Sequence, residues 1–250
     1  MTAVAPRPRR AARPVTDVVV RRLEQLVLAE LEPGAELPSE SALAGEFGAS
    51  RLTVREAVKT MQARGLLEVH RGRRPTVAYP NARPVGDFFA SVIRRDPHQL
   101  LDLLEVRRAL EVHIAALAAS HAGRGSLAAM QAALDAMRQD PDDLDAVQAA
   151  DLDFHESLAA ASGNRLLSYL IEAMEEPLRA SRLHSLRGHL SRGGTVDDLV
   201  DQHARILDRV TARDAKGASA AMRDHLAQTA RDLRAAFTTA LPGNDTEDNP

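Results

Sequence analysis

Asp151 and His155 lie four residues apart in the stretch DLDFHESLAA, which the spacing of apolar residues predicts to be helical. Residues four apart share one face of a helix, so both side chains can reach the same point. His203 and His225 lie in two later segments that are also predicted to be helical. One carboxylate and three imidazoles suit a divalent transition metal that keeps positions open for water or a ligand. Spacing alone indicates this only weakly, because the chain has 9 His and a lone helical His is more often a surface or satisfied polar residue.

A second group of residues could contact nucleic acid. Arg51, Thr53 and Arg55 open a predicted helix, and Arg51 and Arg55 share one face of it. One Arg can bond a guanine edge bidentately and the other a phosphate, while Thr53 can bond a phosphate or contact a base. A basic turn follows, able to approach the DNA backbone or enter the minor groove; its residues are Arg71, Gly72, Arg73 and Arg74. The alternative is a winged helix that makes only protein contacts.

The elements predicted around these residues have the order of a winged helix-turn-helix. Helices are expected over about residues 17–31, after Ser39 as far as Gly48, and after Ser50 as far as Gly65. The segments LLEVH and TVAY read as two short strands joined by the basic turn. A recognition helix of this fold meets the major groove with its N-terminal turn, where Arg51 and Arg55 stand.

The rest of the chain is predicted to be an antiparallel helical bundle, so the fold class is mostly α with a small β-hairpin wing. The expected helices are 86–94, 99–122, 126–138, 143–162, 164–187 with an interruption at Pro177, 196–212 and 215–238. The domain organisation that follows is a basic disordered tail over 1–14, a DNA-binding domain over 15–80, a linker and connecting helix over 81–97, a helical effector, metal-binding and dimerisation domain over 98–240, and a disordered tail over 241–250.

Composition sets outer limits on function. There is no Cys, which excludes disulfides and thiolate chemistry and fits a reducing cytosol. No apolar run approaches the length of a membrane span, and the basic N-terminus lacks the apolar core of a secretory signal, so we expect a cytoplasmic protein without membrane contact. Residues 1–85 contain 14 Lys and Arg against 9 Asp and Glu, whereas residues 86–250 contain 18 against 26. A basic front and an acidic back favour two domains with different partners.

The stretch LPSESALAGEFGASRLTVREAVKTMQARGLLEVHRGRRPTV resembles the DNA-binding domain of the GntR family of bacterial regulators. The resemblance implies that Arg51, Arg55 and Gly72 contact DNA. The sequence departs from the family pattern at two points. Ser41 stands where many members have an Arg that contacts DNA, and Arg74-Pro75 replaces the end of the usual Gly-x-Gly of the wing. The departures imply a different operator sequence or a different strength of wing contact.

The later part of the chain resembles the FCD effector domain of the FadR subfamily of GntR regulators. The matching segments are Glu105-Val106-Arg107 with Leu110-Glu111, Asp151-Leu152-Asp153-Phe154-His155, Ser162-Gly163-Asn164, His203 with Ile206-Leu207, and Met222 with His225-Leu226. The resemblance implies that Asp151, His155, His203 and His225 hold a divalent transition metal. Some members lack these ligands and bind acyl-CoA, and the presence of all four argues against that branch. His184 and His189 have no such match and are expected at the surface.

Arg107 is the residue that the resemblance implies for binding an acidic effector. We expect it to face the cavity near the metal, where its guanidinium can pair bidentately with a carboxylate. The alternative is a salt bridge to Glu111, four residues on, or to Glu105.

These features predict a transcriptional regulator and not an enzyme. The expected protein is a homodimeric repressor that binds a palindromic operator in double-stranded DNA and is released by a small organic acid. Zn, Ni, Mn or Fe would suit its His and Asp ligands. The alternative is a metal-dependent hydrolase or lyase fused to a winged helix, but HESLA has Ala159 where a zinc-protease motif needs its second His. A helical scaffold with a vestigial site is a third possibility.

Overall fold

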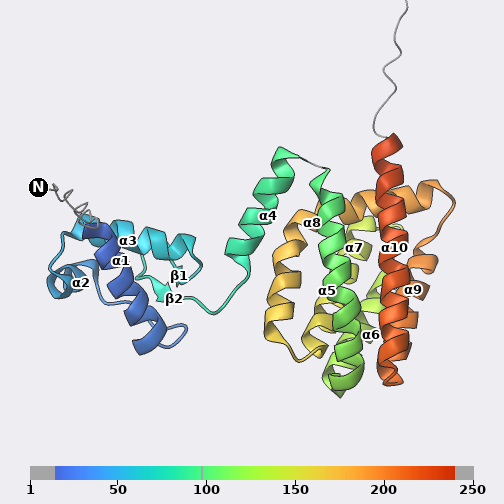
Figure 1. The fold of residues 1–250 in the computed structure, drawn as a ribbon, viewed down its shortest axis with the longest axis horizontal. Helices are drawn as coiled ribbons and strands as arrows, with labels where there is room; N and C mark the ends of the chain where they lie inside the picture. Colours follow the sequence, from blue (N-terminus) through green and yellow to red (C-terminus); the bar gives the residue numbers. More distant parts are fainter. Residues whose placement is uncertain (1–14, 97, 240–250) are drawn as a thin grey trace, which may run out of the picture. The chain divides into compact units, whose positions relative to one another are not determined.

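The computed structural model describes residues 15–96 and 98–239, and its contacts divide the chain into two compact units, residues 1–84 and 85–250. The described residues are mainly helical, with one two-stranded antiparallel sheet in the first unit (Figure 1). This is the mostly α class that the sequence predicts. The two tails predicted over 1–14 and 241–250 lie outside the described residues.

The first unit is built on a three-helix core. Its helices are α1 (Val15–Gln25), which continues as a π-helix η1 (Leu26–Glu30), α2 (Glu40–Phe47) and α3 (Arg51–Ala63). The first helix was predicted over about 17–31, so it begins earlier than expected and changes geometry in its last turn. Leu23 on α1 and Val54 and Met61 on α3 are completely buried in one apolar cluster. That cluster fixes the orientation of α3, which carries the predicted DNA contacts.

Local caps determine where α2 and α3 begin. The Ser39 hydroxyl accepts a hydrogen bond from the Ala42 amide at 3.2 Å, and the Ser50 hydroxyl accepts one from the Thr53 amide at 3.1 Å. Gly48 ends α2 with φ of 61°, a left-handed conformation that glycine adopts at low cost. Ser39 therefore sets the start of α2, and Gly48 and Ser50 set the turn between the two helices, as the sequence predicts.

The wing is a short hairpin. Strand β1 (Leu67–Glu68) pairs antiparallel with β2 (Thr76–Val77), with Leu67 opposite Val77. Both strands are shorter than the predicted segments LLEVH and TVAY, because the chain leaves the ladder before the basic turn. Gly72 in that turn has φ of 76°, which an L side chain rarely adopts.

The second unit is a bundle of helices (Figure 1). Its elements are α4 (Arg83–Arg95), α5 (Gln99–His121), α6 (Arg124–Gln139), α7 (Leu144–Ala161), α8 (Arg165–Ser191), α9 (Val196–Thr211) and α10 (Ala215–Thr239). Helix α5 packs along α10, and α7 packs against both α6 and α8. A single large apolar cluster joins α5 to α10, and Phe154 is completely buried within it.

Helix α8 continues through Pro177, so the predicted interruption there is wrong. Proline lacks the N–H that would bond the carbonyl four residues earlier, which here belongs to Ala173. Gly86 of α4 lies against that carbonyl, because a Cβ built on Gly86 would be 3.2 Å from the Ala173 oxygen. The carbonyl that Pro177 leaves without a helical donor is therefore the one that α4 approaches, and α8 continues without a break.

Candidate functional site

The four residues predicted to hold a metal come together inside the second unit. Helix α7 supplies Asp151 and His155 from one face, α9 supplies His203, and α10 supplies His225. One donor atom from each lies within 4.8 Å of the others, and all four residues are buried. His203 Nε2 is 3.0 Å from Asp151 Oδ1 and 3.3 Å from His155 Nε2. Below we call these four residues the metal cluster.

Each imidazole of the metal cluster is held by a hydrogen bond through its Nδ1. His203 Nδ1 donates to the Leu199 carbonyl at 2.8 Å, and His225 Nδ1 is 3.1 Å from Gln202 Oε1. His155 Nδ1 bonds a carboxylate oxygen of Glu111. With Nδ1 engaged in each ring, Nε2 is the nitrogen left to bind a metal, and outer partners of this kind orient metal-binding His in proteins.

Burial keeps these rings neutral. Removal from water lowers the pKa of His155 and of His203 to about 4. Burial, followed by the neighbouring rings of His203 and His155, also lowers the pKa of His225. A neutral imidazole can bind a metal without first losing a proton, so the cluster is ready to do so near neutral pH.

Two arginines and a glutamate surround the metal cluster. Arg107 pairs with Glu111, which in turn bonds His155, and Arg182 pairs with Asp151. Burial alone would raise the pKa of Glu111, but the charge of Arg107, then the hydrogen bond from His155 and the charge of Arg182, more than offset that effect and hold the pKa well below its usual range. The carboxylate is therefore ionised, and each acid near the metal cluster is matched by a guanidinium.

Sequence reasoning missed the role of Arg182, although the sequence carried a signal for it. Arg182 lies midway between Leu178 and Leu186 on one face of α8, and both leucines are buried. A charged residue in the middle of an apolar stripe must have a buried partner, because an unpaired buried charge is costly. Naming Asp151 as that partner required knowledge of how α7 and α8 pack.

A small cavity lies beside the metal cluster. Its volume is about 40 Å³, and Arg107, Asp151, Arg182, His189 and His225 are among its lining residues. The position of Arg107 agrees with both interpretations, and its role toward an effector stays a prediction. Arg107 forms the salt bridge to Glu111 that was the alternative, and it also lines the cavity, where its Nη2 is buried without a hydrogen-bond partner.

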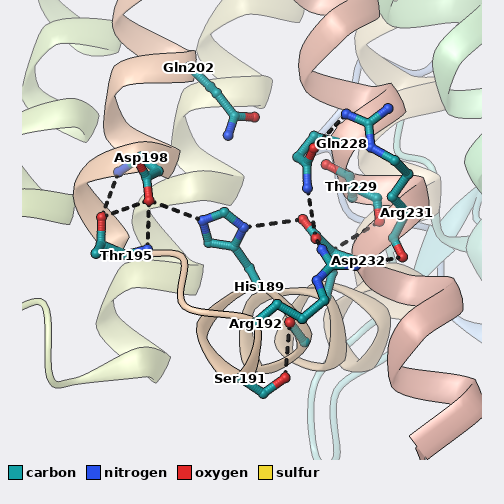
Figure 2. Close-up of polar contacts among 12 residues, drawn as sticks. His189, Ser191, Arg192, Thr195, Asp198, Gln202, Gln228, Thr229, Arg231 and Asp232 are labelled. Atoms are coloured by element: carbon teal, nitrogen blue, oxygen red, sulfur yellow. Dashed lines mark hydrogen bonds and ion pairs between the residues drawn. The ribbon is translucent and has the colours of Figure 1, made fainter.

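His189 is half-buried and lines this cavity, so its predicted surface position is wrong. Figure 2 shows its ring between two carboxylates, with Nε2 3.7 Å from Asp198 and Nδ1 3.5 Å from Asp232. The error arose because α8 was expected to end at residue 187, whereas it runs to Ser191 and carries His189 against α9 and α10. The side chain of His184 lies outside the described residues.

The predicted DNA contacts on α3 are exposed to different degrees. Arg51 and Arg55 are exposed, whereas Thr53 is half-buried and its hydroxyl is 2.8 Å from that of Ser50. Glu40 of α2 holds Arg55 with two hydrogen bonds, of 3.1 and 2.8 Å. Sequence reasoning missed this pair, which orients Arg55 before any DNA is present.

The wing presents its basic residues to solvent. Arg71, Gly72 and Arg73 are all exposed, and Arg74 is 3.7 Å from Glu36. Arg74 and Pro75 also line a shallow groove that runs past Arg51 toward Ser41. The two departures from the family pattern therefore lie on one surface, next to a predicted DNA contact.

Two family profiles match the chain. Residues 15–77 match "Bacterial regulatory proteins, gntR family", and residues 102–228 match "FCD domain". The chain belongs to the GntR family of bacterial regulatory proteins. This GntR-family chain is a transcriptional regulator with a DNA-binding domain and an effector-binding FCD domain, and it is not an enzyme. The hydrolase or lyase alternative has no support.

Similar proteins carry the same organisation. The "HTH-type transcriptional regulator LutR" of Bacillus subtilis is 33% identical over 79% of this chain and 90% of its own length. The "Glc operon transcriptional activator" of Escherichia coli strain K12 is 29% identical over 88% of this chain and 89% of its own length. The "HTH-type transcriptional repressor NanR" of Salmonella newport is 28% identical over 86% of this chain and 84% of its own length. Activators and repressors are thus both found among the relatives of this regulator.

A solved structure agrees with the fold of this GntR regulator. "Streptococcus agalactiae GntR" is 25% identical, with a TM-score of 0.68 over 87% of this chain and 99% of the other. Among the helices that the structure describes, none combines the length and apolar character that a membrane span requires.

Proposed function

We propose that this regulator is a homodimeric repressor that leaves a palindromic operator when a small organic acid binds beside a divalent transition metal in its FCD domain. The proposal places its action on DNA in the cytoplasm. We assign the DNA-binding domain to residues 15–80, the connecting segment to 81–97, and the effector, metal-binding and dimerisation domain to 98–240. The FadR subfamily is the group whose pattern the FCD region resembles.

One observation carries the effector half of the proposal. Asp151 and His225 of the metal cluster line the same small cavity as Arg107, and Arg107 has a buried donor atom without a hydrogen-bond partner. Buried polar atoms are nearly always hydrogen-bonded, so a donor of this kind calls for a bound acceptor. A carboxylate supplies the planar acceptor that a guanidinium binds best.

The residues present fit a metal. Four donors of the right kinds converge in the bundle interior, and the three rings are neutral and oriented by their Nδ1 partners. Imidazole and carboxylate suit Zn, Ni, Mn or Fe. When bound, the ion would offer coordination positions to a carboxylate and an adjacent hydroxyl. The residues that would hold it are Asp151, His155, His203 and His225, from three different helices.

The operator half of the proposal rests on α3 and the wing. We assign base contacts to Arg51 and Arg55, a phosphate or base contact to Thr53, and backbone or minor-groove contacts to Arg71, Gly72 and Arg73. A single recognition turn reads few base pairs, so useful specificity needs two half-sites and a symmetric dimer. The exposure of Arg51 and the pre-set orientation of Arg55 support these roles.

The experiment that tests the proposal uses the purified full-length chain. Operators are selected from random duplexes, the oligomeric state is measured by light scattering, and bound metal is measured by elemental analysis. We expect a dimer, a selected sequence with two-fold symmetry and one divalent ion per chain. Small carboxylates should raise the melting temperature and lower operator affinity, and neutral sugars should do neither. Stabilisation by neutral sugars and not by acids would contradict the effector assignment.

A further inference from the structure

Three buried side-chain nitrogens in the described part of the chain have no hydrogen-bond partner. They are Arg107 Nη2, Arg182 Nε and His189 Nε2. All three residues line the cavity beside the metal cluster. Since buried polar atoms are rarely left unpaired, three of them around one cavity indicate a ligand with several oxygen acceptors.

Arg107 and Arg182 both line this cavity. Arg107 and Arg182 are 2% and 8% exposed, and each already holds a carboxylate, Glu111 and Asp151 respectively. A guanidinium has five N–H donors, so each arginine keeps donors for a second partner. An acid bound by these arginines would be close to the metal cluster, because Asp151 and His225 line the same cavity.

The charges around the cavity favour a ligand with two negative charges. The positive charges of Arg107 and Arg182 balance the negative charges of Glu111 and Asp151. A divalent ion held by the metal cluster would then leave two positive charges uncompensated in a buried site. Buried charges are tolerated only when they are paired, and a dianion would pair them.

His189 supplies the third nitrogen without a hydrogen-bond partner. Asp232 lies on one side of its ring and Asp198 on the other, but distances of 3.5 and 3.7 Å are too long for hydrogen bonds (Figure 2). Arg192 pairs directly with Asp232, so that carboxylate is already neutralised. Asp232 faces Nδ1, whereas Nε2 faces Asp198 and has no hydrogen-bond partner. A ligand oxygen that comes closer to Nε2 than Asp198 does would form that hydrogen bond.

We propose that the cavity selects a small dicarboxylate, with one carboxylate between Arg107 and Arg182 beside the metal cluster and the second hydrogen-bonded to His189. The inference rests on the proposed function, because it names the class of acid that the same site takes. A cavity of about 40 Å³ restricts that acid to a short carbon chain. His189 is then the residue that separates dicarboxylates from monocarboxylates.

Two probes of nearly the same shape test this selection. L-Malate and L-2-hydroxybutyrate share a carboxylate and an adjacent hydroxyl. Malate has a second carboxylate at the position where 2-hydroxybutyrate has a methyl group. Titration calorimetry on the metal-loaded full-length protein should show malate binding at least about tenfold more tightly, a difference of about 1.4 kcal/mol. Equal affinity for the two acids, or tighter binding of 2-hydroxybutyrate, would overturn the inference.

Variants of His189 show whether it makes the selection. H189L replaces the imidazole with an apolar side chain of similar size that cannot form hydrogen bonds. The affinity of the protein for malate should fall to its affinity for 2-hydroxybutyrate, and the affinity for 2-hydroxybutyrate should not change. H189Q keeps an N–H donor and should retain much of the preference. The matched control is H113L, which makes the same change at an exposed histidine of α5 that does not line the cavity, and it should keep the full preference. An equal loss for both acids in H189L would assign His189 a purely structural role and overturn the inference.

The outcomes separate this inference from the proposed function. If 2-hydroxybutyrate binds as well as malate and both release the operator, the dicarboxylate assignment fails and the carboxylate effector stands. If neither these acids nor other small carboxylates bind the metal-loaded protein, both the inference and the proposed effector class are wrong.

Discussion

The side chains of Arg51 and Arg55 differ in how far they are oriented in the absence of DNA. Glu40 holds Arg55 through both of its oxygens, and the same pairing lowers the pKa of Glu40 through its hydrogen bond to Arg55. Arg51 is exposed on the same helix turn. Arg55 therefore meets DNA as an oriented group, whereas Arg51 must be ordered on binding.

R51A should weaken operator binding by about 1–3 kcal/mol if the side chain makes a bidentate base contact. Folding should be unaffected, because the side chain is exposed. Fluorescence anisotropy on the selected operator measures the change. R124A removes the same charge from an exposed position at the start of α6 in the second unit, and it should bind as the wild type does. If the double variant R51A/R55A bound the operator with wild-type affinity, the assignment of base contacts to Arg51 and Arg55 would be wrong.

H155A should lower the metal content of the protein, its melting temperature and its response to the effector. The substitution removes one donor of the metal cluster and leaves the carboxylate of Glu111 buried without its imidazole partner. Operator binding without effector should persist, because the first unit has its own apolar core. H113A, an exposed histidine on α5, is the control and should change none of these properties. If H155A bound a full equivalent of metal, the stretch DLDFHESLAA would have no metal-binding role and would be only a structural helix.

At the scale of elements, Pro177 and Gly86 act together. The proline leaves the Ala173 carbonyl without its helical donor, and α4 approaches that carbonyl at a residue without a side chain. The contact positions α4 against the bundle at the start of the segment that connects the two units. Helix α4 is otherwise held by partly buried residues, since none of its residues is fully buried.

G86L should displace α4 from α8 and lower the stability of the second unit by about 1–3 kcal/mol, the usual cost of forcing a side chain into a filled contact. Chemical denaturation followed by circular dichroism measures the loss. G125L is the matched control, because a Cβ at this helical position meets nothing within 4 Å and leucine favours a helix more than glycine does. A loss as large in G125L as in G86L would show that the Gly86 contact has no special role.

At the scale of the whole molecule, the metal cluster joins α7 to α9 and α10, which follow it in the sequence after the long helix α8. A ligand can shift the equilibrium between DNA-competent and incompetent dimers only by as much as its affinity differs between them. Because the cavity is bounded by side chains of several helices, a bound acid would favour one arrangement of those helices over another.

Effector binding should lower operator affinity by a coupling free energy of about 1–3 kcal/mol, roughly 5–150-fold. After removal of the metal with a chelator, the melting temperature should fall and the effector should no longer change operator affinity. Anisotropy titrations with and without malate, on chelated and on reloaded protein, measure both effects. If the effector still lowered operator affinity to the same extent in protein shown to be free of metal, the ion would have no part in coupling effector binding to DNA release.

Much of this protein can be predicted from local sequence, because the signals act within a few residues. Ser39, Ser50 and Gly48 set the helix-turn-helix boundaries through hydrogen bonds and dihedral angles of their immediate neighbours. Asp151 and His155 share a face because they are one helical turn apart. The order of the helices followed from their apolar periodicity, and the winged-helix and FCD domains followed from the motifs that those helices carry.

Only the tertiary structure decided which distant groups meet. Arg182 holds Asp151 across 31 residues, Glu111 holds His155 across 44, and Glu40 holds Arg55 across 15. Nothing within a few residues of these side chains encodes their partners, because long-range pairing depends on how helices pack. His189 shows the same limit, since its place at the cavity follows from the full length of α8 and from the positions of α9 and α10. The four residues of the metal cluster could be named from the sequence through their resemblance to the FCD pattern. The three buried nitrogens on which the proposed class of acid rests can be found only in the packed bundle.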